Sequence, residues 1–374
     1  MKNSDTPFFL GYVEQGIGGS QDPLMPPISI SRNGTLAKWR GKLHFINLRV
    51  NDPGLKKNAA AFEDMLQKTE TLGIKTIITL PEYVPHYYEL PPEPPASDKP
   101  EEKVPVRKTA VKKPVRLVHF RPCYLSLPAA IEGNPAYHTL SVEDCLPIIE
   151  MAAKFKVGHI IVPVSEPGIF LDPQAENRFK KALKSINEVA KVNNIRLHLR
   201  NGGISASVFQ KMAKEFGCGL AYNVGVAHLE RDDIIETYRR FADNISIVIL
   251  QQVLPGLDKW GARRDDMEQA LKNYAGAKKE YSQSLSDNDE AWQERCLKNF
   301  NKALHDYYES CRNACFNLGL FQNGDLNLVP LLKELRKDLE AGHEKFFLLE
   351  TVPNTKNSDL IARYVLPDNF PGSF

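Results

Sequence analysis

The residues that could do chemistry in this chain come directly after short apolar runs, where strands would end. Arg200 and Asn201 follow the run at 195–199, and Glu350 follows the run at 346–349. A guanidinium can orient a carboxylate, a phosphate or hydroxyl groups, and a carboxylate can move a proton. Arg200 and Glu350 are therefore candidates for catalysis or ligand orientation. The alternative is that Arg200 and Glu350 form a structural ion pair that fills a barrel mouth with no ligand site.

Other polar residues occupy comparable positions on other predicted strands. His119 and Arg121 end the run at 115–120, and His119 could transfer a proton, although a single histidine on a strand is more often simply packed. Glu82 could reach the same region, although we expect it to be exposed. The further candidates for ligand contact are Arg121, Glu166, Asn201, Asn223, His228, Gln251 and Gln252. The amides among them would suit a polyol, with ordinary loop hydrogen bonding as the alternative.

These candidates need a scaffold that brings strand ends together, and the sequence pattern supplies one. Short apolar runs alternate with amphipathic stretches, which predicts parallel β/α units, and eight such units favour a closed (β/α)8 TIM barrel. The expected strands are 42–49, 76–80, 115–120, 159–164, 195–199, 219–226, 245–250 and 346–349. The candidate residues would then gather at the carboxyl ends of the strands, where barrels of this kind hold their sites.

Domain organisation follows from the same pattern. We expect an N-terminal extension at 1–41 and a single barrel over 42–374. Residues 91–114 contain seven prolines and many charges, so they predict an extended excursion after the second strand that adds little stability. Residues 263–317 are strongly helical and charged, which predicts a helical hairpin inserted after the seventh strand.

The hairpin offers a possible contact surface. Trp260, Trp292, Tyr307 and Tyr308 could form an aromatic face, and aromatic anchors are enriched at interfaces. Since the hairpin starts at the carboxyl end of a strand, we expect it to cover the barrel mouth or to contact a second copy or another protein. The alternative is a decoration packed on the side of the barrel.

Composition narrows the class of protein. Of 374 residues, 42% are apolar, which is enough for one large core. A net charge of +2 gives no reason to expect a nucleic acid or an acidic membrane as partner. The polar start, the absence of a long apolar stretch and six scattered cysteines predict a cytoplasmic protein without a signal peptide or a membrane span.

Four stretches resemble the xylose isomerase-like (sugar isomerase/epimerase) TIM-barrel superfamily. One resembles a fifth strand that normally ends in Glu-Asn, and one resembles the sixth-strand pattern Asp-x-Gly-His-Ala. A third lies where the family has a His and, three residues later, an Asp. The last resembles the family's final Gly-Asp turn, helix and Glu-ended strand. In that order, the stretches are 195–203, 219–230, 245–252 and 320–336 with 347–350.

The resemblance also implies that the usual chemistry has changed. The family holds a divalent metal with Glu, Asp, His and Glu at strand ends, and the metal polarises a sugar carbonyl. Here the first three positions are Arg200, Asn223 and Ile249, and only Glu350 matches. Arg200 also places a fixed positive charge where the cation would lie. We therefore expect a divergent member with a degenerate metal site, no metal and no other cofactor.

Two functions stay open at this point, and so does the question of whether the protein is an enzyme. In the first, it binds or acts on a sugar-like or small anionic molecule at the barrel mouth without the metal. In the second, it is a non-catalytic pseudoenzyme that acts through protein contacts of the hairpin. A metal-dependent isomerase or epimerase with a rearranged site is a weaker third reading.

Overall fold

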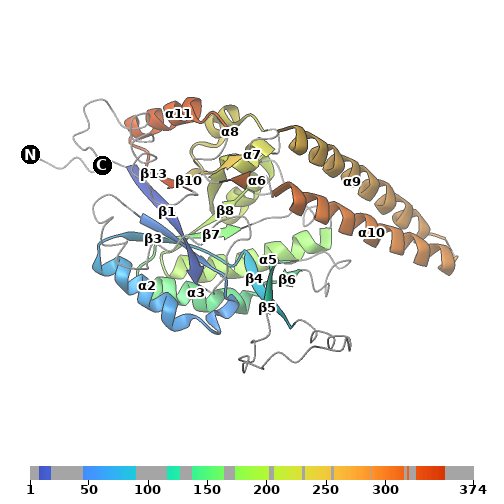
Figure 1. Ribbon diagram of the computed structural model, residues 1–374, viewed down its shortest axis with the longest axis horizontal. Helices are drawn as coiled ribbons and strands as arrows, with labels where there is room; N and C mark the ends of the chain where they lie inside the picture. Colours follow the sequence, from blue (N-terminus) through green and yellow to red (C-terminus); the bar gives the residue numbers. More distant parts are fainter. Residues whose placement is uncertain are drawn as a thin grey trace, which may run out of the picture.

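A closed barrel of eight parallel strands forms the centre of the protein, seen here in a computed structural model (Figure 1). The structure describes residues 8–17, 45–89, 116–126, 137–163, 173–201, 206–229, 232–253, 257–287, 289–315, 318–319 and 326–349. Around the barrel the strand order is β1-β13-β10-β9-β8-β7-β3-β2. The strands are β1 (Phe8–Ile17), β2 (Phe45–Val50), β3 (Lys75–Thr79), β7 (His159–Pro163), β8 (Arg196–Arg200), β9 (Gly219–Asn223), β10 (Ile245–Leu250) and β13 (Lys345–Leu349). This is the α/β TIM-barrel class that the alternation predicts.

The first strand of the barrel lies inside the segment that we expected to be an extension. β1 pairs with β13 on one side and with β2 on the other, so it closes the barrel. The barrel therefore begins before residue 42. Its sequence, FFLGYVEQGI, is interrupted by Gly11, Glu14 and Gln15, which breaks the continuous apolar run typical of a buried parallel strand.

The assignment of 115–120 as the third barrel strand is wrong. That stretch belongs to β5 (Arg116–Tyr124), which pairs antiparallel with β4 (Tyr83–Glu89) in a separate sheet. β6 (His138–Thr139) completes this three-stranded sheet. A short apolar run cannot by itself distinguish a barrel strand from a hairpin strand. The proline-rich segment at 91–114 lies between β4 and β5 and is outside the described residues.

Helices cover the outside of the barrel (Figure 1). They are η2 (Pro53–Leu55), α2 (Ala59–Thr71), α3 (Val142–Lys154), α5 (Pro173–Val192), α6 (Ala206–Phe216), α7 (Val224–Leu229), α8 (Ile234–Phe241) and α11 (Val329–Glu340). The inside of the barrel is filled by a smaller apolar layer: Phe45, Ile77, Ile161, Ala221, Ile247, Ile249, Phe346 and Leu348. Because strand side chains alternate between the two faces, residues two positions further along these strands also face inward.

Two long helices separate β10 from α11. α9 (Leu257–Ser284) and α10 (Glu290–Cys315) run side by side and extend away from the barrel (Figure 1). A short two-stranded pairing of β11 (Gln252–Val253) with β12 (Leu318–Gly319) joins their ends. None of the helices in the described part of the chain combines the length and apolar character needed to cross a bilayer.

The aromatic residues of this helical pair pack mainly within it. Tyr307 is buried, and its ring stacks on that of Tyr274 with centroids 6.3 Å apart. Tyr274 and Leu304 belong to one buried cluster with Tyr124 of the small sheet, so the helical pair packs against that sheet. Tyr307 therefore does not belong to the free aromatic face that we expected. Trp292 is partly buried, and the side chains of Trp260 and Tyr308 are outside the described residues.

Candidate functional site

A set of buried polar side chains lies inside the barrel where the strands end. Four of them follow a residue of the interior apolar layer by two positions, and Arg200 follows the buried His198 in the same way, so strand alternation turns each into the barrel. The set comprises Asn47 on β2, Thr79 on β3, Arg200 on β8, Asn223 on β9 and Gln251 after β10, all buried. The carboxyl end of the barrel is therefore polar above an apolar layer.

The central contact at this end is an ion pair between Arg200 and Glu82. Arg200 Nη2 donates to Glu82 Oε1, and the two residues are only 9% and 7% exposed. The expectation that Glu82 is exposed is wrong, because the chain after β3 turns into the small sheet rather than outward. The backbone O of Glu82 accepts from Cys123 N at 2.8 Å, which fixes the residue over the barrel end.

Burial strengthens the attraction between the two charges of this ion pair. Removing two charges from water is costly, and each partner here offsets the charge of the other. Arg200 does bring a fixed positive charge to the barrel mouth, as the sequence suggests. However, Glu82 neutralises that charge locally, so the site as a whole is polar rather than strongly cationic.

The amides at this end form a connected network. Asn201 Nδ2 donates to Asn223 O at 3.0 Å, and Asn223 N donates to Asn201 Oδ1 at 2.6 Å. Asn223 Nδ2 donates to Gln251 Oε1 at 2.7 Å, while Asn223 Oδ1 accepts from Val226 N at 3.2 Å. The structure therefore brings three predicted residues together. Asn201 mainly holds the backbone, and Asn223 also caps the start of α7.

Two further polar residues belong to the site and were missed from the sequence. Thr79 Oγ1 donates to Asn47 Oδ1 at 2.9 Å, and both residues are only 1% exposed. Their signal was present, since each is a polar residue inside an apolar strand, at the inward-facing position two residues after Phe45 or Ile77.

The other predicted residues have different outcomes. His119 and Arg121 lie on β5, where they pair with His86 and Val84 of β4, so they are not barrel strand ends. Their side chains, and that of Gln252 on β11, are outside the described residues. His228 is partly buried on α7. Glu166 and Glu350 also lie outside the described residues.

The family's metal-ligand positions can be followed on the described strands. Arg200 pairs in register with Ala221, and Ile249 pairs with Asn223 and Leu348. Ile249 belongs to the apolar interior layer. Within the described ranges, no three His, Cys, Asp or Glu side chains come close enough to hold a metal ion.

Comparisons with known proteins found a likeness in structure only. No protein-family model and no curated protein matches the chain. Solved structures of xylose isomerase-like TIM-barrel proteins match it over most of its length. A D-tagatose 3-epimerase-like protein is 12% identical with a TM-score of 0.49, over 96% of this chain and 97% of that one.

Two further structures illustrate the range of the likeness. A xylose isomerase-like TIM-barrel protein from Mycobacterium smegmatis, in complex with magnesium, is 11% identical with a TM-score of 0.45, over 96% of each chain. A xylose isomerase domain protein from Planctomyces limnophilus is 15% identical with a TM-score of 0.39, over 66% of this chain and 72% of that one. At such identities the chemistry of this protein has to be argued from its own residues.

Proposed function

We propose that the carboxyl end of the barrel binds a small sugar-like molecule, and that it does so without a divalent metal. The observation that carries the proposal is the buried Arg200–Glu82 ion pair at the mouth of the barrel. TIM barrels place their sites at this end, built from strand ends and the loops that follow them. Whether the bound molecule also reacts is a separate question.

The chemistry of the pair suits a neutral polyhydroxylated ligand. A guanidinium only donates hydrogen bonds and a carboxylate only accepts them, whereas a sugar hydroxyl does both. Adjacent hydroxyls can therefore bridge Arg200 and Glu82 without breaking the balance of charge. A small anion would have to compete with Glu82 for Arg200, so it is the less favoured ligand. Arg200 also supplies, as a fixed cation, positive charge of the kind that a metal brings in related folds.

The test is calorimetric titration of neutral monosaccharides into the full-length protein in EDTA. We expect saturable binding of at least one sugar, weakened about tenfold or more by Glu82→Gln and by Arg200→Gln. Arg239→Gln is the matched control, because it removes an exposed Arg–Glu pair with Glu334 on the outer helices. A requirement for Mn²⁺ or Mg²⁺, or binding that ignores both mouth variants, would contradict the proposal.

A second candidate function is self-association through the helical pair α9–α10. Four large hydrophobic side chains are exposed in the described part of the chain, and three of them lie on or beside this pair: Leu271, Leu285 and Leu297. Exposed leucines on helices that extend away from the barrel favour a contact with a second copy of this chain. Figure 1 shows the pair extending outward, which favours this contact over a cover for the barrel mouth.

Sedimentation over a range of protein concentrations tests this second candidate. We expect a dimer that Leu271→Ser with Leu297→Ser converts to a monomer. Val192→Ser is the control, since Val192 is 83% exposed on a different helix. A protein that stays monomeric at all concentrations would remove the candidate.

A further inference from the structure

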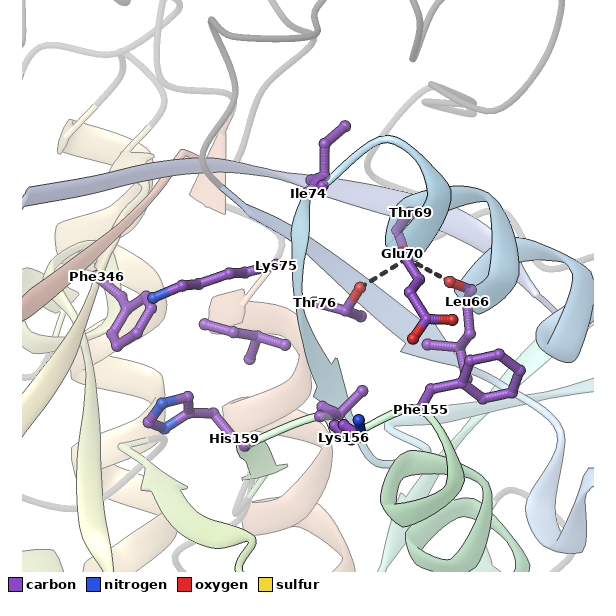
Figure 2. Close-up of a pocket in the computed structure, with 14 residues that line it drawn as sticks. Leu66, Thr69, Glu70, Ile74, Lys75, Thr76, Phe155, Lys156, His159 and Phe346 are labelled. Atoms are coloured by element: carbon purple, nitrogen blue, oxygen red, sulfur yellow. Dashed lines mark hydrogen bonds between the residues drawn. The ribbon is translucent and has the colours of Figure 1, made fainter.

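The amino end of the barrel contains a cavity of about 350 Å³. It is lined by residues from α2, β3, the turn before β7, and β13 (Figure 2). Its edge lies at the surface, where four of the lining residues are exposed: Glu70, Gly73, Lys75 and Lys156. The volume lies within the range of small-molecule sites, and cavities of about 150 Å³ bind benzene when Leu, Ile and Phe line them.

We propose that this cavity is a binding site for a small uncharged molecule with an apolar, ring-sized body. It is distinct from the proposed sugar site, because the cavity lies where the strands begin and the sugar site where they end. A ligand that packs against the lining restores contacts that a cavity in a close-packed interior forgoes, so its binding stabilises the folded protein.

Buried apolar side chains form the inner part of the lining. Leu66, Ile74 and Val157 belong to the hydrophobic cluster that the outer helices share with the strands. Ile77 and Phe346 belong to the apolar layer inside the barrel. All five are at most 5% exposed. The cavity therefore touches both apolar layers of the fold, and an apolar ligand there is removed from water.

Aromatic rings line two sides of the cavity. Figure 2 shows the rings of Phe346 and His159 on one side and the ring of Phe155 on the other. The centroids of the Phe346 and His159 rings are 4.7 Å apart. Because aromatic rings pack favourably against one another edge to face or offset, these walls favour a ligand that contains a ring.

The polar side chains deeper in the lining bond to other protein groups. Thr69 Oγ1 donates to Leu66 O at 2.9 Å, so it accepts from Thr76 Oγ1, which is also 2.9 Å away, as the dashed lines in Figure 2 show. His159 Nδ1 lies 2.9 Å from His198 Nε2, so a hydrogen bond joins the two rings. An apolar body therefore suits this part of the cavity better than a polar one, which would lose its hydration there.

The charged side chains of the lining belong to exposed residues at its edge. They carry both signs, since Glu70 lies there with Lys75 and Lys156. Figure 2 shows the Lys75 side chain extending toward Phe346. A lysine in this position can cover apolar surface with its methylene groups while its charge stays in water. An uncharged ligand can thus be covered without an ionic partner.

The test titrates toluene into the full-length protein and follows the methyl NMR signals of Leu66, Ile77 and Val157. We expect these signals to shift saturably. Gly158 lines the cavity, and a Cβ added there would have no atom within 4 Å beyond its chain neighbours. Gly158→Leu should weaken toluene binding about tenfold or more, because the new side chain occupies the space that the ring would fill. Gly158→Ala, the smaller change, should have an intermediate effect.

The matched control is Gly276→Leu on α9, since an added Cβ also has open space there and Gly276 lies outside the lining. It should leave the affinity for toluene unchanged. Benzoate carries the same ring with a charge, and it should bind more weakly because the charge would lose hydration. Equal weakening by both leucine variants would overturn the proposal, as would methyl signals that do not move. Tighter binding of benzoate than of toluene would also overturn it, and none of these results depends on sugar binding at the other end.

Discussion

The two ends of this barrel hold different polar groups. At the carboxyl end, Arg200 meets Glu82 inside the protein, and the neighbouring amides bond to one another. At the amino end, Lys75 and Lys156 line an open cavity beside a neutral histidine pair. The carboxyl end holds a buried ion pair, whereas the amino end holds a histidine pair beside a cavity.

The ion pair bears directly on the function proposed for the carboxyl end. Under the proposed function, a ligand there inserts between Arg200 and Glu82, which favours neutral hydroxyls that both donate and accept hydrogen bonds. The apolar layer that contains Ile77 and Ile161 separates the two ends.

The largest expected effect comes from breaking the buried ion pair. Glu82→Ala leaves the Arg200 charge buried without its partner, which should lower the free energy of unfolding by about 3–5 kcal/mol. The double variant Glu82→Leu with Arg200→Met should recover most of this loss, because it removes both charges. Urea denaturation measures both. A loss below about 1 kcal/mol for Glu82→Ala would mean that the charges are solvated.

The next effect concerns pH at the amino end. The pKa of His159 is lowered from 6.5 to about 4 in the folded protein. The unfolded chain therefore binds a proton that the folded one does not, so stability is full above pH 6.5 and falls as the pH drops toward 4. The loss attributable to His159 is about 3 kcal/mol by linkage. His159→Gln should flatten the stability profile between these pH values, and an unchanged profile would refute the assignment.

A smaller effect tests the packing of the histidine pair. A Cβ added at Gly219 would overlap the His198 ring, which is fully buried. Gly219→Ala should therefore destabilise the protein by about 1–3 kcal/mol, as overpacking of a core does. His198→Ala should remove the overlapping ring. Gly219→Ala should therefore reduce the stability of the His198→Ala variant by less than it reduces the stability of the original protein. Thermal unfolding of the four proteins gives the comparison, and strictly additive losses would argue against contact.

The smallest effect lies in the amide network at the carboxyl end. Asn223→Ala removes the cap of α7 and the bond to Gln251, which should cost about 1–2 kcal/mol. It leaves the Arg200–Glu82 pair in place. If the variant still binds sugar, the amides stabilise the fold and the ion pair contacts the ligand. Loss of binding without loss of stability would reverse those roles.

The sequence predicted the barrel better than the site, for a physical reason. Strands of a parallel barrel are buried on both faces, so they read as apolar runs, and 245–250 coincides with β10. β1 contains Gly11 and Glu14 and escaped this pattern. Arg200 was recognisable as a polar residue at a strand end. Glu82, 118 residues away, was considered for the same region but expected to be exposed, because no local pattern encodes which side chains a turn brings together.

The cavity at the amino end could not have been predicted at all. Its walls come from segments as distant as Leu66 and Phe346, and its volume depends on how their side chains pack. His159 and His198 did carry a signal, since both sit at inward positions of neighbouring strands. The contact between His159 and His198 can be inferred only once the strand register, which pairs Ile161 with His198, is known.

The most direct test of the central claim is a crystal structure of the protein grown with the sugar that binds most tightly in calorimetry, in the presence of Mn²⁺. The account predicts sugar density within hydrogen-bond distance of Arg200 and Glu82, and no anomalous signal from manganese at that end of the barrel. Manganese bound at the strand ends, with Glu350 among its ligands, would contradict it. So would a mouth that stays empty while the sugar occupies another part of the protein.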